Sequence, residues 1–231
     1  MKDWLESMVQ SVGNPLEWNG VDKGMLLSAL MLPVLLSYVL WCELALHQTA
    51  DGAIFNFAEL RTQKLYLWSF LGLALLNLLL GLHLRRSNPD SRFYQHLAVQ
   101  LFAIGLGFLG YRTGSLSMVS GVSLTGVPLV FYVFFDKKIV VAGVLTAMAL
   151  VFGTALASTQ GLLPYEPVMA DQGGGEERTF FWVASMVFVF VLPQMLLLFG
   201  IFAYVIARWR QREAEVEQLS VRDPLTGVLN R

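Results

Sequence analysis

The chain has 231 residues, of which 55% are hydrophobic and 14% charged, and its formal net charge is −1. Its mean hydropathy of +0.57 is far above that of a typical soluble domain, so the composition indicates a membrane protein. Without a basic excess the chain cannot neutralise a run of phosphates, and we expect no nucleic-acid partner. Its single cysteine, Cys42, excludes an intrachain disulfide.

Residues 1–23 precede the first long apolar run. Apolar residues recur at helical spacing from Trp4 to Val12, with polar residues on the opposite face. The segment lacks the short apolar core and the small-residue cleavage site of a secretory signal. We therefore expect a short helix that lies at the membrane surface and anchors the chain there.

Residues 24–207 contain six apolar segments that could each cross the bilayer. A helix rises about 1.5 Å per residue, so roughly 20 apolar residues cross a hydrocarbon core about 30 Å thick. The predicted spans are Met25 to Leu46, Leu65 to Leu84, Phe93 to Tyr111, Leu116 to Phe135, Ile139 to Ser158 and Phe180 to Ala207. The expected fold is therefore an all-α membrane protein, a bundle of six transmembrane helices.

The loops between these spans alternate in their content of Lys and Arg. Basic residues collect in cytoplasmic loops, so the basic connections should face the cytoplasm. They contain Arg85, Arg86, Arg92, Lys137, Lys138, Arg208, Arg210 and Arg212. The opposite connections are residues 48–63, the tight turn 112–115 and the acidic stretch 160–179. This alternation predicts that both termini are cytoplasmic, and it needs all six spans, because omitting the fourth would place the last basic cluster outside.

Ionisable side chains near the outer ends of the first and third spans form a candidate ligand pocket. Charged groups inside a bilayer are costly and usually face the bundle interior. Glu43 lies about one turn inside the first span, and His47 follows four residues later on the same face. The candidate pocket residues are Tyr38, Trp41, Glu43, His47, Tyr111 and Arg112. They could hold a small amphipathic molecule; alternatively, Glu43 pairs structurally with Arg112 or reaches the interface.

Other polar residues within the predicted spans have simpler interpretations. Asn77 and Gln100 lie at similar depths, which predicts a hydrogen bond between the second and third spans. His83 and His96 flank one loop, but two histidines without further ligands make a poor metal site. We therefore expect no metal site.

The sixth span continues into a helix with a coiled-coil pattern. Pro193 lacks an N–H group and predicts a hinge or a static kink, where Gln194 could bond the freed carbonyl. Beyond it, residues at spacings of four and three form the seam of a heptad: Val205, Trp209, Arg212, Val216 and Leu219. Residues 208–222 are thus predicted to form a short dimerising signalling helix, with an ordinary juxtamembrane helix as the alternative.

The last nine residues, 223–231, read Asp-Pro-Leu-Thr-Gly-Val-Leu-Asn-Arg. Pro224 ends the preceding helix, and Gly227 permits a tight bend. This run closely resembles the Asp-x-Leu-Thr-Gly-Leu-x-Asn-Arg motif that opens the catalytic domain of the GGDEF family, the diguanylate cyclases. Val228 is the one departure. The matching positions are Asp223, Leu225, Thr226, Gly227, Asn230 and Arg231.

The resemblance implies that residues 223–231 begin a truncated GGDEF domain. Members of the family condense two GTP molecules into cyclic di-GMP across a dimer of catalytic domains, with Mg²⁺ or Mn²⁺. The Gly-Gly-Asp/Glu-Glu-Phe loop that performs this chemistry is absent from the 231 residues, so we expect no catalytic residue and no cofactor in this fragment. In architecture the membrane part is similar to the MASE class of sensor domains that precede such cyclases, which implies a homodimer in a bacterial inner membrane.

These expectations combine into a membrane-embedded sensory module that controls a cyclase through the sixth span. A passive anchor that only dimerises the cyclase would differ from it solely in lacking a ligand. A small transporter or channel would need a polar path at the midplane, for which the spans offer few residues. Input to a histidine kinase would need a phosphoacceptor His after the coil, and none is present.

Overall fold

The computed structural model describes residues 18–47, 55–115 and 134–165, together with single positions and short runs within 117–132 and 181–216. Within this part the chain is helical. Four of its helices are long and apolar enough to cross a membrane: α2 (Gly20–His47), α3 (Phe57–Ser87), α4 (Arg92–Thr113) and α6 (Lys137–Thr159). The protein is therefore an all-α membrane protein. Four of the six predicted spans are confirmed, each lying within one of these helices.

Polar side chains set where these helices begin. Asn19, Asn56, Ser91 and Asp136 each accept a hydrogen bond from a backbone N–H of the first helical turn, at 2.8, 3.3, 3.3 and 3.1 Å. Such caps satisfy N–H groups that have no partner within the helix. At the other end of α4, Gly114 closes the predicted tight turn with a φ of 104°, which a residue without a Cβ adopts readily.

Helix α3 begins eight residues earlier than the apolar run predicts. The expected loop over 48–63 was wrong in its second half, because residues 57–63 belong to the helix. Asn56 caps it, and Glu59 at the third helical position matches the acidic residue of a capping pattern. With 31 residues α3 is about 46 Å long, which exceeds a hydrocarbon core of about 30 Å. Its first two turns therefore extend past the apolar segment and carry Glu59, Arg61 and Lys64.

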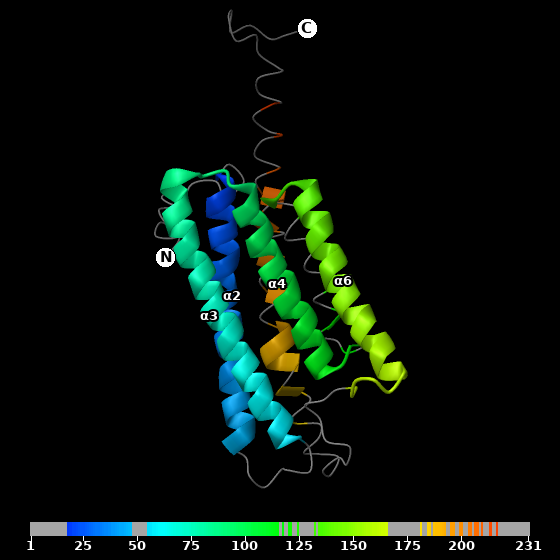
Figure 1. Cartoon of the computed structure of the whole chain (residues 1–231). Helices are drawn as coiled ribbons and strands as arrows, with labels where there is room; N and C mark the ends of the chain where they lie inside the picture. The colour runs from blue at the N-terminus through cyan, green and yellow to red at the C-terminus, as the bar shows by residue number, and fades with distance from the viewer. Residues whose placement is uncertain are drawn as a thin grey trace, which may run out of the picture.

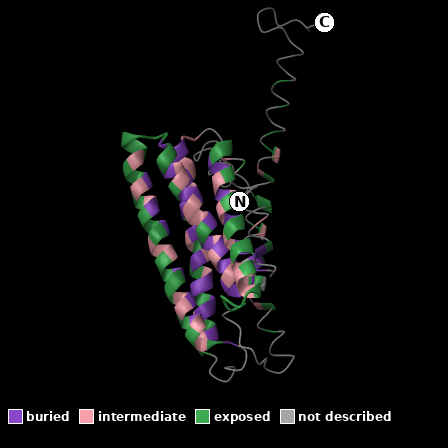
Figure 2. Ribbon diagram, turned by 45° about the vertical axis from the view of Figure 1, so that its right-hand side comes forward, coloured by how far each residue is buried: buried purple, intermediate pink, exposed green. Residues whose placement is uncertain are grey.

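The helices pack side by side, with α3 running opposite to α2, α4 and α6 (Figure 1). Helix α2 contacts α3 extensively and also contacts α4, while α4 packs against α6. In contrast, α3 and α4 contact each other at few positions. Buried residues lie along the inward helix faces (Figure 2). One apolar cluster joins α2 to α3, and a second joins the first halves of α2, α4 and α6.

Helices α4 and α6 are parallel although they are consecutive in the described part of the chain. Near their C-terminal ends, Ser115 Oγ lies 3.1 Å from Thr154 Oγ1. Near their N-terminal ends, Val99 and Ile139 share one apolar cluster. Residues 115 and 134 therefore lie at opposite ends of the bundle, and the predicted fourth span lies between them in the sequence.

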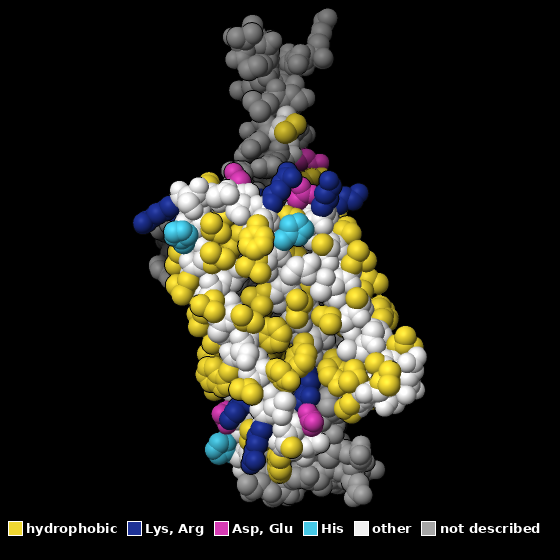
Figure 3. Space-filling model, viewed as in Figure 1, with side chains coloured by type: hydrophobic (Ala, Val, Ile, Leu, Met, Phe, Trp, Pro, Cys, Tyr) yellow, Lys and Arg dark blue, Asp and Glu magenta, His cyan; other side chains and the backbone are white. Residues whose placement is uncertain are grey.

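Charged side chains gather at the two ends of the bundle, and hydrophobic side chains fill the band between them on the face seen in Figure 3. Large apolar residues within the spans, such as Trp68 and Leu76 of α3 and Phe152 of α6, are 48%, 63% and 55% exposed. A surface of this kind is typical of contact with lipid. We call the end where α2, α4 and α6 begin the basic end. It carries Arg85, Arg86, Arg92, Lys137 and Lys138. The opposite end is the far end.

Helical positions are also described between Phe181 and Val216, including a π-helical turn, η2 (Val187–Val191). Val191 is 4% exposed and belongs to the apolar cluster of α2 and α3. Trp41 of α2 donates a hydrogen bond from Nε1 to Ser185 Oγ at 3.0 Å. The sixth segment therefore packs against α2. The segment before residue 18, most of the predicted fourth span, part of the predicted sixth span and the closing motif lie outside the described residues.

Candidate functional site

A buried arginine organises the far end of the bundle. The Arg112 side chain, in the last turn of α4, is 6% exposed. Its Nε donates to Gln63 Oε1 at 2.9 Å, its Nη1 to Glu59 Oε2 at 2.8 Å and its Nη2 to the Glu59 carbonyl at 2.7 Å. A guanidinium away from water is tolerated only when its N–H groups are paired in this way. The three bonds tie the end of α4 to the start of α3.

Glu43 forms a separate ion pair, with Lys64 of α3, at 2.8 Å. The alternative in which Glu43 pairs with Arg112 was therefore wrong. Because α3 begins at Phe57, it supplies Lys64 to Glu43 and Glu59 to Arg112. Sequence reasoning missed Glu59, Gln63 and Lys64, which it assigned to a loop or its edge. The cap at Asn56 was the signal that could have placed them on the helix.

The remaining candidate pocket residues lie at the same end but face different neighbours. His47 is exposed, and its Nδ1 lies 2.8 Å from the carbonyl oxygen of Glu43. Trp41 is 3% exposed and meets the ring of Phe55 edge-on, with 5.6 Å between ring centroids. The Tyr111 ring lies 6.4 Å from that of Phe108. The six predicted residues therefore share one end of the bundle, and their joint role in ligand binding stays a prediction.

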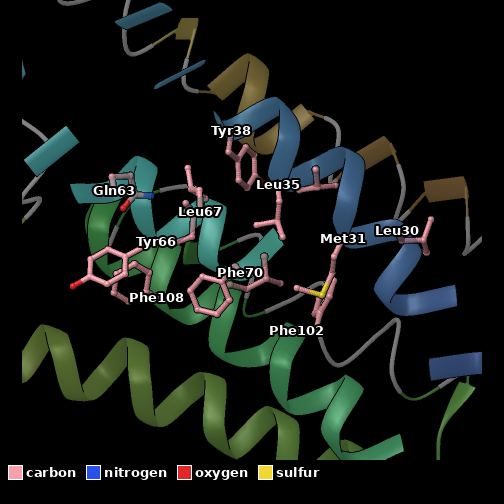
Figure 4. A pocket seen from close by; sticks show the side chains of 14 residues that line it. Leu30, Met31, Leu35, Tyr38, Gln63, Tyr66, Leu67, Phe70, Phe102 and Phe108 are labelled. Carbon is pink, nitrogen blue, oxygen red and sulfur yellow. The ribbon is translucent and has the colours of Figure 1, made fainter. Parts of the chain in front are cut away.

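An apolar pocket lies between α2, α3 and α4 (Figure 4), and its lining includes Gln63, the residue that accepts a hydrogen bond from Arg112. Its empty space, including the open mouth, is about 570 Å³. The lining includes Met31, Tyr38, Gln63, Phe70, Gly105 and Phe108. Of the predicted pocket residues only Tyr38 contributes. The spacing of Phe102, Gly105 and Leu109 on one face of α4 was the available signal, because a glycine among large apolar residues leaves room beside a helix.

A second buried polar cluster lies closer to the basic end. Asn77 Nδ2 donates to Ser28 Oγ at 2.8 Å, Ser28 Oγ donates to the Gly24 carbonyl at 3.0 Å, and Tyr94 Oη donates to the Asn77 carbonyl at 3.0 Å. The predicted bond between Asn77 and Gln100 was wrong, because Asn77 faces α2. Bonds of this kind hold transmembrane helices together.

The basic end is tied together by the turn between α3 and α4. Val21 N donates to the Pro89 carbonyl at 2.9 Å, and Gly20 N donates to Asp90 Oδ1 at 3.2 Å. Arg85 and Asp22 form an ion pair at 2.9 Å. Across the described ranges, no three His, Cys, Asp or Glu side chains come together as metal ligands would.

Of the predicted signalling residues, two are described. Trp209 and Val216 lie at helical positions seven residues apart and are 63% and 65% exposed. The π-turn η2 ends two residues before Pro193. Outside the described residues lie Pro193, Gln194, Val205, Arg212 and Leu219, and with them the domain-opening residues Asp223, Leu225, Thr226, Gly227, Asn230 and Arg231.

No protein-family model matches the chain, and neither the curated proteins nor the solved structures contain a match to it.

Proposed function

We propose that this chain is the membrane-embedded input module of a diguanylate cyclase. The observation that carries the proposal is the run from Asp223 to Arg231, in which six of the family's fixed positions match and Val228 alone departs. A motif that opens a catalytic domain implies that a cyclase domain follows it. The module would then dimerise the cyclase and control cyclic di-GMP synthesis from the membrane.

The proposed topology has six spans, with both termini in the cytoplasm of a bacterium and the chain in its inner membrane. The basic residues at the basic end, Lys23 among them, support this orientation, since Lys and Arg favour the cytoplasmic side. The far end carries fewer basic residues among those described, namely Arg61, Lys64 and Arg112. The parallel arrangement of α4 and α6 supports a further crossing between residues 115 and 134.

The proposed route of the signal is the sixth segment. Trp41 of α2 contacts Ser185, and Val191 packs among core residues of α2 and α3, so a change in α2 would reach this segment directly. The adjoining π-turn is a common feature of functional sites in helices. The exposed Trp209 and Val216, one heptad apart, would face a second copy of the chain.

The two rival functions fit the described residues less well. A transporter needs a polar path through the bundle, whereas the pocket is almost entirely apolar and Asn77 is bonded to Ser28. A passive anchor needs no pocket, and the space beside Gly105 therefore favours a sensor.

A fusion experiment tests the proposal. A GGDEF catalytic domain is joined in frame after Arg231, and cyclic di-GMP is measured in bacteria that lack their own cyclases. We expect more cyclic di-GMP than from the same catalytic domain expressed without the membrane part, because the membrane part pairs two catalytic domains. Equal output at equal protein level would contradict the proposal.

A further inference from the structure

We propose that the pocket between α2, α3 and α4 binds a single acyl chain, which enters from the bilayer between α3 and α4. The binding itself follows from the geometry of the pocket. Only its effect on an output domain rests on the function proposed above.

The lining of the pocket selects an apolar occupant. Apart from Gln63 and the hydroxyls of Tyr38 and Tyr66, its side chains are hydrocarbon or the thioether of Met31. A polar solute would lose its hydration here without replacement hydrogen bonds. A hydrocarbon chain has no hydrogen bonds to lose on entering the pocket. Its binding is favoured by removal of apolar surface from water and by close packing.

We place the entrance to the pocket at Tyr66, the lining residue that is most exposed on the apolar surface. Helices α3 and α4 make few contacts with each other, and both helices line the pocket. Tyr66 at this entrance is 42% exposed, and its ring meets that of Phe108 at 4.8 Å between centroids. Phe70 lies 5.9 Å from the same ring. An occupant would therefore pass aromatic side chains that border the hydrocarbon band, and it would come from the membrane.

The shape of the pocket favours a slim chain. On α2 the lining runs from Tyr38 to Leu30, eight residues or about 12 Å along the axis. One leaflet of the hydrocarbon core is about 15 Å deep, so the pocket lies alongside most of a leaflet. The cavity volume is small, about 40 Å³. A flexible unbranched chain fits such a narrow space, whereas a fused-ring sterol does not.

Gln63 supplies a polar group at the end of the pocket that is nearest the far end of the bundle. Its Oε1 accepts a hydrogen bond from Arg112 Nε, which leaves the amide nitrogen available to donate. Among the hydrogen bonds between described residues, none is donated by that nitrogen. A carboxyl or ester oxygen at the head of an acyl chain would accept from it. Arg112 is thus a positioning residue for Gln63. A free fatty acid and one chain of a phospholipid share this chemistry.

Gly105 offers a way to fill the pocket without disturbing its polar end. A Cβ at Gly105 would lie 3.6 Å from Phe70 Cδ1 and 3.7 Å from Met31 Cε, at ordinary contact distances. A leucine there would place its branched end in the pocket. Gly153 of α6 is the matched control, because a Cβ at Gly153 meets nothing within 4 Å.

The test uses the purified 231-residue chain in lipid nanodiscs. A fatty acid carrying a diazirine, or a phosphatidylglycerol carrying the same chain, is crosslinked by light and the labelled peptides are mapped by mass spectrometry. We expect labels on pocket residues of α3 and α4, reduced at least fivefold in Gly105→Leu and unchanged in Gly153→Leu. Labelling by the fatty acid alone identifies a free acid as the occupant, and labelling by the phospholipid identifies a bilayer chain.

Labelling spread evenly over the lipid-facing surface, or equal in the two glycine variants, would overturn the proposal. Thermal unfolding confirms that each variant is folded. If Gly105→Leu is not folded, Gly105→Ala replaces it, with an expected reduction of about twofold. No cyclase takes part in this measurement, so a failure of the fusion experiment leaves its result unaffected.

Discussion

Arg112 Nη1, at the end of α4, lies 2.8 Å from Glu59 Oε2, in the first turn of α3, and the two residues differ in exposure. The Arg112 side chain is 6% exposed and that of Glu59 is 38% exposed. The buried partner is therefore the cation, and it depends on Glu59 and Gln63 for its hydrogen bonds. This relationship connects two helices that otherwise contact each other little.

Replacing Glu59 by glutamine should destabilise the protein. Glu59→Gln leaves a buried guanidinium without its carboxylate, at a cost of about 1–3 kcal/mol in the free energy of unfolding. Titration of the purified protein with sodium dodecyl sulfate, followed by circular dichroism, measures this energy. The control is Lys64→Ala, which breaks a pair whose side chains are 29% and 39% exposed and should cost less than about 1 kcal/mol. Equal losses in the two variants would contradict this account of Arg112.

The buried polar cluster of Asn77, Ser28 and Tyr94 predicts an unusual order of stability for two variants. Asn77 Oδ1 is buried and has no hydrogen-bond partner in the described part of the chain, while Nδ2 donates to Ser28. Ser28→Ala removes that acceptor and should cost about 1–2 kcal/mol. Asn77→Leu removes both polar atoms, and Ser28 keeps its bond to Gly24. We therefore expect the leucine variant to unfold at the higher temperature of the two. The reverse order would show that Asn77 has a further partner.

The Tyr94 side chain packs against Gly81 of α3. This contact predicts that substitutions at the two positions have coupled effects on the free energy of unfolding. A Cβ at Gly81 would overlap the Tyr94 hydroxyl and Met25. Gly81→Ala should therefore cost about 1–3 kcal/mol through overpacking. The same change in a Tyr94→Phe background should cost less, since the hydroxyl is gone.

Gly72 is the control for Gly81, because a Cβ there meets nothing within 4 Å. Gly72→Ala should change the unfolding energy by less than about 0.5 kcal/mol. Additive effects of Gly81→Ala and Tyr94→Phe in the unfolding titration would exclude the proposed contact.

The spans were predictable to the extent that their apolar runs are uninterrupted. In α6 the predicted and observed bounds differ by at most two residues. In α3 they differ by eight residues, because Glu59, Arg61 and Lys64 were counted as loop although a helix can extend past the hydrocarbon core. These bounds depend on local sequence. The capping residue Asn56 was the signal that would have placed the start of α3 correctly.

Partners across helices were not predictable in the same way. Depth alone suggested Gln100 as the partner of Asn77, but rotation of α3 about its axis turns Asn77 toward Ser28 of α2. One alternative paired Glu43 with Arg112, but the structure pairs it with Lys64, at 2.8 Å. The pocket depends on the separation of α3 from α4, a tertiary feature that no local pattern contains.

The proposed topology predicts opposite accessibility of two loops. Asn88, between α3 and α4, is exposed, and Leu162, after α6, is 72% exposed. In intact spheroplasts a membrane-impermeant maleimide should label Leu162→Cys but should label Asn88→Cys only after lysis. The native Cys42 is fully buried and should give little background. Labelling of both positions from the same side would contradict the topology.

The most direct test of control through the sixth segment is the spacing between the membrane and the catalytic domain. In the fusion with a GGDEF domain, insertion of seven residues after Glu217 keeps the heptad phase, and insertion of four changes it. We predict that cyclic di-GMP synthesis remains within about twofold of the parent after the seven-residue insertion and falls at least fivefold after the four-residue insertion. Equal synthesis in both variants would contradict a rigid helical connection between this membrane domain and its output.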